Sequence, residues 1–97
     1  MKLDDSNFHP HLRARMLQRG VIKEEIERVL NDGWEVADAK SGTLGKALVF
    51  SHKGNWEGKY FEEKEVRVYY KFVNDEFTLL TVKARYGKDF QKRGEIK

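Results

Sequence analysis

The first third of the chain has the apolar spacing of two helices. A helix near His9–Arg19 is predicted, with Pro10 at its first position, where the missing N–H costs nothing, and Gly20 at its end. Residues three or four positions apart share one side of a helix. The expected buried stripe comprises Phe8, Leu12, Met16 and Leu17. A second, basic stripe comprises His11, Arg15 and Arg19.

A second helix is predicted near Lys23–Asp32, with Gly33 after it. Glu24 and Glu25 lie in its first turn, where the helix dipole favours negative charge. Ile22 fills the capping position but carries no hydrogen-bond acceptor on its side chain, which predicts a weak helix start. The expected inner face comprises Ile26, Val29 and Leu30.

From Trp34 onward the apolar period changes to two, which is typical of strands. Strands are predicted at 34–37, 46–51, 65–72 and 77–86, and a glycine-containing loop at 52–59. Tyr60-Phe61 fits either a short strand or a loop. Two helices followed by strands indicate an α+β fold, with both helices packed on one face of an antiparallel sheet of about four strands.

The last two strands should pair around a turn at Asn74-Asp75. Matching apolar to apolar positions places Tyr70 opposite Leu80, which requires a loop of three or five residues between the strands. The core face would then comprise Val66, Val68, Tyr70, Leu80, Val82 and Ala84. The opposite face would collect Arg67, Tyr69, Lys71, Lys83 and Arg85, with no interleaved carboxylate.

Length and composition indicate one small domain, with an ordered core at about 8–87 and a charged tail at 88–97. The chain has 97 residues and no cysteine, which excludes disulfides, zinc–thiolate sites and thiol catalysis. It contains no apolar run of membrane-spanning length and no signal-peptide core, so we expect a cytoplasmic protein without a membrane partner. His9 and His11 should point apart on a helix, so neither a metal nor another cofactor is expected.

The charge is distributed unevenly along the chain. Residues 64–97 carry nine Lys/Arg and five Asp/Glu, whereas the rest of the chain is nearly balanced. A basic C-terminal third favours a polyanionic partner such as nucleic acid. The alternative is an ordinary solvated, lysine-rich surface.

Two segments resemble a bacterial family of unknown function. The first runs from His11 through Arg15-Met16 to Arg19-Gly20-Val21 and is followed by an acidic second helix; the second is Leu80–Gly87, with an Ala-Arg ending. This opening resembles the pattern His-x-x-x-Arg-Met-x-x-Arg-Gly-Ile, and the order of elements is similar to that of RelE and BrnT toxin ribonucleases. The resemblance implies a RelE-like sheet, RNA or the ribosome as partner, an antitoxin protein, and, less directly, ribonuclease activity. The longer segment 53–64, which includes Trp56, departs from the pattern.

Metal-independent RNA cleavage needs a base, an acid and cations that stabilise the phosphorane. His11, Tyr69 and Arg85 are the catalytic candidates, with His52 and Tyr86 as alternatives for the acid or base. The expected nucleic-acid contacts are Arg15, Arg19, Arg67, Lys71 and Lys83.

Each of these residues also has a structural interpretation. His11 could bond to the backbone at the helix start, and Arg15 and Arg19 could form ion pairs with Glu24, Glu25 or Glu27. Trp56 could stack on a base or cover a core edge. The function expected from the sequence is that of a small basic protein acting on RNA as a metal-independent, toxin-like endoribonuclease. The alternatives are a non-catalytic RNA- or ribosome-binding module and a protein-interaction domain.

Overall fold

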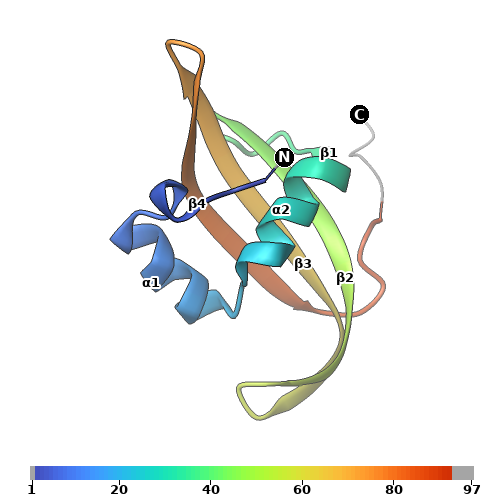
Figure 1. The fold of residues 1–97 in the computed structure, drawn as a ribbon. Coiled ribbons are helices and arrows are strands. Elements are labelled where there is room, and N and C mark those ends of the chain that lie inside the picture. Colours follow the sequence, from blue (N-terminus) through green and yellow to red (C-terminus); the bar gives the residue numbers. More distant parts are fainter. Residues whose placement is uncertain (1, 93–97) are drawn as a thin grey trace.

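In the computed structural model, which describes residues 2–92, two helices lie on one face of a four-stranded antiparallel sheet (Figure 1). The strand order is β1-β2-β3-β4, so each strand pairs with its neighbour in the sequence. The predicted α+β arrangement is thereby confirmed. The elements are η1 (Asp5–Asn7), α1 (Pro10–Arg19), α2 (Lys23–Asp32), β1 (Trp34–Glu35), β2 (Leu44–Trp56), β3 (Lys59–Val73) and β4 (Glu76–Gly87).

The ends of both helices follow local rules. Pro10 begins α1 while the His9 ring accepts a hydrogen bond from the His11 N–H, and Gly20 ends it in the left-handed conformation at φ 70°. At α2 the Glu25 carboxylate accepts a hydrogen bond from the Ile22 N–H at 3.1 Å. A capping interaction thus comes from the third helical position although Ile22 itself provides no acceptor.

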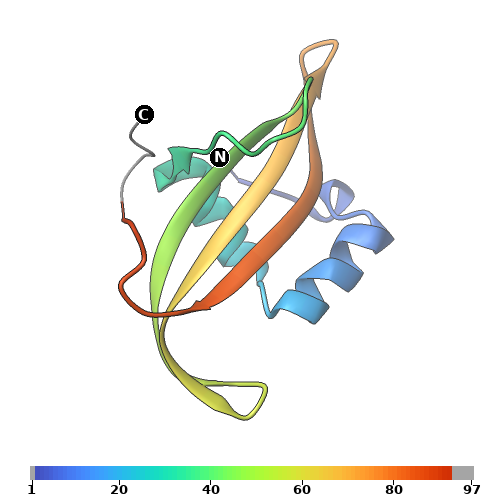
Figure 2. The ribbon, with the colours of Figure 1, turned by 180° about the vertical axis from the view of Figure 1, so that it is seen from behind.

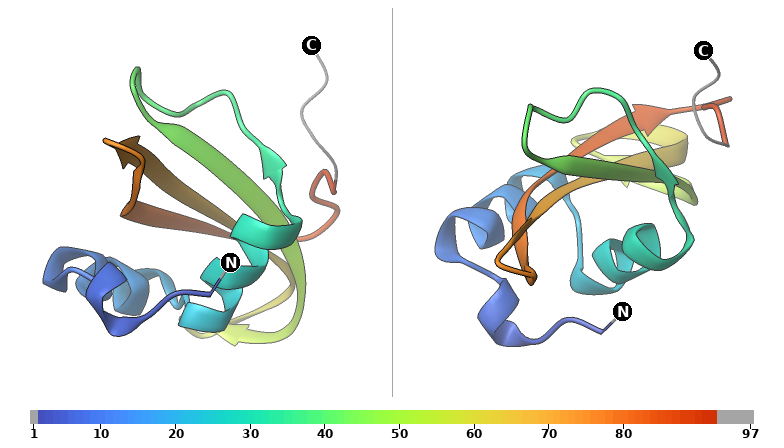
Figure 3. Two further views of the ribbon diagram at one scale, coloured as in Figure 1. Left: turned by 45° about the horizontal axis from the view of Figure 1, so that its top comes forward. Right: turned by 90° about the horizontal axis from the view of Figure 1, so that it is seen from above.

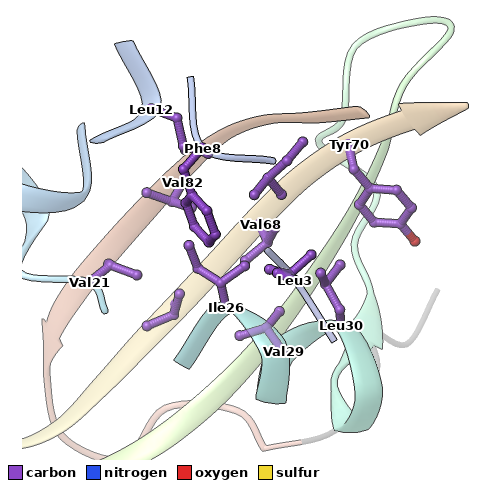
Figure 4. Packing of buried hydrophobic residues seen from close by; sticks show 12 residues of the cluster. Leu3, Phe8, Leu12, Val21, Ile26, Val29, Leu30, Val68, Tyr70 and Val82 are labelled. Atoms are coloured by element: carbon purple, nitrogen blue, oxygen red, sulfur yellow. The ribbon is translucent and has the colours of Figure 1, made fainter. Parts of the chain in front are cut away.

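The main core lies between the helices and the sheet (Figure 4). The predicted inner face of α2 is confirmed, and Leu12 of α1 packs with it against β3 and β4. Leu3 is also buried, so the core begins before the predicted boundary at residue 8. Leu17 is 83% exposed, so its predicted burial is wrong. The stripe that α1 buries is narrow and follows Phe8, Leu12 and Met16. The largest fully buried side chains are Leu12, Ile26, Val29, Val66, Val68 and Val82.

A β-bulge corrects the predicted register of the β3–β4 hairpin. The connection has only two residues, Asn74 and Asp75, both with positive φ, as in the tight hairpin turns that match strand twist. The register then shifts between Tyr69 and Tyr70, so that Tyr70 faces Leu79 instead of Leu80. The predicted longer loop is therefore wrong, because the bulge supplies the extra residue. Leu79 enters the main core, and Leu80 joins a smaller cluster on the opposite face.

The predicted loop at 52–59 is also wrong, because β2 and β3 continue as a long hairpin around a turn at Glu57-Gly58. In Figure 1 this hairpin extends beyond the helices. Tyr60-Phe61 is strand. Trp56 stacks on Tyr86 of β4 with ring centroids 4.8 Å apart, so tertiary packing holds a glycine-containing segment in strand form.

The face of the sheet opposite the helices is covered only in part. The connection between β1 and β2 crosses it near one end of the sheet, and β3 and β4 are otherwise uncovered there (Figure 2). Val36 of this connection is buried against Ala47 and Tyr69. The predicted tail lies partly outside the described residues, and in its described part the Phe90 N–H donates to Glu63. Within residues 2–92, every helix is too short or too polar to cross a membrane.

Candidate functional site

The face of the sheet opposite the helices carries a cluster of cations on β3 and β4. The register pairs Glu65 with Arg85 and Arg67 with Lys83, and alternation along each strand points all four side chains to this face. We call these four residues, together with Asp38, the Glu65 site. Its cations are three of the residues that the sequence predicted on one face.

Glu65 lies at the centre of the site. Its Oε1 accepts hydrogen bonds from Arg67 Nε at 3.1 Å and from Arg85 Nε at 2.9 Å, and the residue is only 3% exposed. Burial alone would raise the pKa of this carboxyl, but the hydrogen bonds and charges of Arg85 and Arg67 together hold the pKa below its ordinary value. Glu65 is therefore ionised at neutral pH.

The prediction that this face has no interleaved carboxylate is thus wrong. Glu65 lies two positions before Arg67 on the same strand, so period-two alternation alone places it on that face. The signal was present in the sequence. The predicted strand at 65–72 includes Glu65, but the predicted faces began only at Val66.

Asp38, from the connection between β1 and β2, adds a second carboxylate. Its Oδ2 accepts a hydrogen bond from the Tyr69 hydroxyl at 2.8 Å and lies 3.2 Å from Arg67 Nη1. Burial, followed by this bond to Asp38, raises the pKa of Tyr69 to about 12. The phenol is therefore protonated at neutral pH, so it can act only as a proton donor, and the raised pKa makes it a weaker donor than an ordinary tyrosine. Lys83 Nζ lies 5.2 Å from the centroid of the Tyr69 ring.

The Glu65 site opens to solvent through a hollow of about 330 Å³. Its lining comprises Asp38, Glu65, Arg67, Lys83, Ala84 and Arg85. Three cations and two carboxylates leave one net positive charge. The Arg85 side chain is 61% exposed, whereas that of Arg67 is 19% exposed, so the former is the more accessible to a ligand. A second hollow, of about 410 Å³, adjoins the first at Asp38 and Lys83 and reaches Lys40 and Tyr69.

His11 and Arg15 lie elsewhere. Both line a hollow of about 510 Å³ between α1 and β4, together with Leu80 and Thr81, and α1 packs on the opposite face of the sheet from Tyr69. The hollow beside His11 and the hollow beside Tyr69 share only Leu80 and Thr81, and among residues 2–92 His11 makes no contact with Tyr69 or Arg85. The His9 and His11 rings stack at 5.1 Å instead of pointing apart, because His9 precedes the helix. In the described part of the chain, no three potential ligand side chains lie close enough to hold a metal ion.

Two further cations that were expected to contact nucleic acid are dispersed. Lys71 lies on β3 opposite Thr78, on the far side of the bulge from the Glu65 site. The Arg19 side chain is exposed, and its carbonyl accepts a hydrogen bond from the Tyr86 hydroxyl at 2.7 Å. For residues 2–92, the structure shows no ion pair of Arg15 or Arg19 with the glutamates of α2.

Tyr86 and His52, the alternative acid–base candidates, belong to a packed aromatic cluster. Their rings make an edge contact at 5.2 Å, and His52 Nε2 is buried without a partner among the described residues. Burial and the nearby acidic residues Glu25 and Glu57 raise the pKa of Tyr86 to about 12. A side chain at Gly20 would come within 2.6 Å of Trp56, so close packing against this cluster requires glycine there.

These features define a small α+β domain with a basic, partly open sheet face. The chain belongs to the family described as "Domain of unknown function (DUF4258)", which matches residues 8–83. The match covers both helices and the sheet as far as Lys83. No curated protein and no solved structure matches the chain.

Proposed function

We propose that the protein is an RNA-binding module that uses the Glu65 site as its phosphate contact. The observation that supports this most directly is the pair of arginines held by one buried carboxylate beside an exposed lysine and an open hollow. Guanidinium groups can bind a phosphate through two parallel hydrogen bonds, and fixing their orientation in advance lowers the entropy lost on binding.

The surroundings of the site are compatible with a strand of RNA. Lys40 and Lys83 line the adjoining hollow, which provides further positive charge along the same face. Phosphate contacts of this kind release counterions, so binding should weaken steeply with salt. The resemblance to RelE and BrnT proteins makes RNA the preferred nucleic acid.

The test is binding of a fluorescently labelled single-stranded RNA at several salt concentrations, with Lys83→Ala compared with Lys59→Ala. Both substitutions remove one exposed lysine, but Lys59 lies at the tip of the β2–β3 hairpin. We expect Lys83→Ala to weaken binding and to reduce the salt slope by about one contact. Equal effects of the two substitutions, or no binding by the wild type at low salt, would reject the proposal.

Endoribonuclease activity is a second candidate, favoured by the contact between Tyr69 and Asp38. A protonated phenol and a carboxylate 2.8 Å apart, beside Lys83, provide an acid, a base and a cation within one hollow. His11 has no part in this arrangement because it lies on the other side of the sheet. Incubating labelled RNA with the protein in the presence of a chelator would test it. Cleavage that is retained in His11→Ala and lost in Tyr69→Phe is the expected result.

A further inference from the structure

β4 leaves one long edge of the sheet unpaired. It is the last strand in the order β1-β2-β3-β4 and spans twelve residues, Glu76–Gly87. Within residues 2–92, no backbone hydrogen bond joins β4 to any segment other than β3. Such an edge presents alternating N–H and C=O groups to its surroundings, and an extended peptide can pair with them.

A hollow, called the groove below, lies at this edge between Leu80-Thr81 of β4 and α1, and α1 lies on the β4 side of the sheet (Figure 3). The hollow there, of about 510 Å³, has Ala14 and Leu80 as its apolar members and Thr81 and Gln18 as polar ones. Residues of two separate elements line it, so a ligand in it would contact the helix and the strand together.

The helix side of the hollow carries Arg15 and His11 and no carboxylate, whereas β4 contributes the uncharged residues Leu80 and Thr81 to its lining. The segment Pro10–Arg19 contains no Asp or Glu, and β4 has an acidic residue only at its first position, Glu76, although Asp and Glu account for 16 of the 97 residues. Arg15 and His11 are exposed on the helix side. Lys83 and Arg85 are exposed on the other side of the edge, in the Glu65 site, where the two carboxylates leave one net positive charge. A partner that approached this edge would therefore meet positive charge on both sides of its backbone.

We infer that the β4 edge is a docking site for an extended acidic segment of a partner protein, which adds to the sheet as a fifth strand. The unpaired backbone selects an extended peptide, because a nucleic acid has no alternating amide donors and acceptors to match it. The positive charge on the two sides of the edge, from Arg15 near the helix and from Lys83 and Arg85 on the opposite face, selects acidic side chains. Ala14 on the helix side of the edge and Leu80, which packs against the cluster on the opposite face, offer apolar contacts to the alternate side chains of the added strand.

The test uses a fluorescently labelled peptide of four Glu-Val repeats as the probe. Three matched peptides accompany it: octaglutamate, which is more negative but has low strand propensity, four Lys-Val repeats, and Glu-Val repeats with alternate amides N-methylated. We expect saturable binding of the Glu-Val peptide alone, with slower amide hydrogen exchange in Thr78–Arg85. Arg15→Ala should weaken binding by about tenfold, and Lys59→Ala should leave it unchanged.

Several outcomes would overturn the inference. Equal binding of octaglutamate or of the N-methylated peptide would show that charge alone attracts the probe. Absence of Glu-Val binding would reject an acidic strand as the occupant. A dimer of the free protein in sedimentation, with slow exchange in β4 before any peptide is added, would assign the edge to a second copy of the chain. Loss of RNA binding in Arg15→Ala with unchanged peptide binding would assign the groove to nucleic acid.

Discussion

Lys64 and Glu65 are neighbours on β3 but point to opposite faces of the sheet. Their ion pairs differ in how far the partner residues are exposed to solvent. Lys64 Nζ lies 2.8 and 2.9 Å from the two oxygens of Glu25, bonds the Gly20 carbonyl, and faces the Tyr86 ring at 5.6 Å. The side chains of Lys64 and Glu25 are 7% and 17% exposed. Glu65 is equally buried, yet one of its partners, Arg85, is mostly exposed.

The difference separates a structural ion pair from a candidate binding site. Lys64 joins the helix layer to the sheet, and its interactions with Glu25 and Gly20 leave little room for a ligand. Glu65 holds two guanidinium groups at the rim of an open hollow, where they can still contact an anion. Similar chemistry therefore stabilises the fold on one face and prepares a surface on the other.

Lys64→Met should have the largest effect on stability, because it leaves the Glu25 carboxylate largely buried without its cation. We expect a loss of about 3–5 kcal/mol in the free energy of unfolding, measured by urea denaturation. The double variant with Glu25→Gln should recover part of the loss, because the buried charge is then absent. Lys59→Met is the matched control at an exposed position. A loss below about 1 kcal/mol would place Lys64 among ordinary surface pairs.

Glu65→Gln should destabilise the protein less, by about 1.5–3 kcal/mol, because it weakens charged hydrogen bonds but leaves the arginines access to water. The pKa of Glu65 is lower in the folded protein than in the unfolded chain. Its stabilising contribution is therefore present above the unfolded pKa and is lost as the pH falls through the folded value. Denaturation curves between pH 7 and about pH 3 should show a smaller loss of stability in the variant than in the wild type. If stability falls equally with pH in the variant and in the wild type, the lowered pKa of Glu65 is contradicted.

Arg85→Ala should weaken RNA binding by tenfold or more, roughly 1.4 kcal/mol, with little change in thermal stability. The exposure of Arg85 limits its contribution to the fold, while its position at the hollow favours ligand contact. Binding assays and thermal melts on the same preparations separate the two effects. If Arg85→Ala mainly unfolds the protein, the Glu65 site is structural like the Lys64 pair, and the interaction-domain function becomes the better explanation.

Ile22→Ser should have the smallest effect, a stabilisation of about 0.5–1 kcal/mol. Ile22 is 55% exposed, so its side chain loses little burial, and a hydroxyl can accept a hydrogen bond from a free N–H of α2. The substitution also tests the surroundings of the Lys64–Glu25 ion pair, because the Ile22 N–H donates to the Glu25 carboxylate. Denaturation midpoints measure it, and a lower midpoint would show that the isoleucine contributes packing at this corner.

The sequence alone determined the parts of the fold that depend on local rules. Pro10, Gly20 and Gly33 delimit both helices as predicted, and the alternation from Val66 to Tyr70 fixes which side of β3 meets them. The shared face of Arg67, Lys83 and Arg85 follows from the same alternation. Glu65 could have been added to it by the same rule.

Tertiary structure decided what depends on contacts between distant segments. The two-residue turn at Asn74-Asp75 is compatible with the core only because a bulge exchanges Leu79 for Leu80, and local sequence does not position a bulge. Asp38 and Tyr69 are 31 residues apart in the sequence, and no sequence pattern predicts their hydrogen bond. The separation of His11 from Arg85 has the same origin: alternation and helical period assign each residue to a face of its own element, and only packing decides which faces meet.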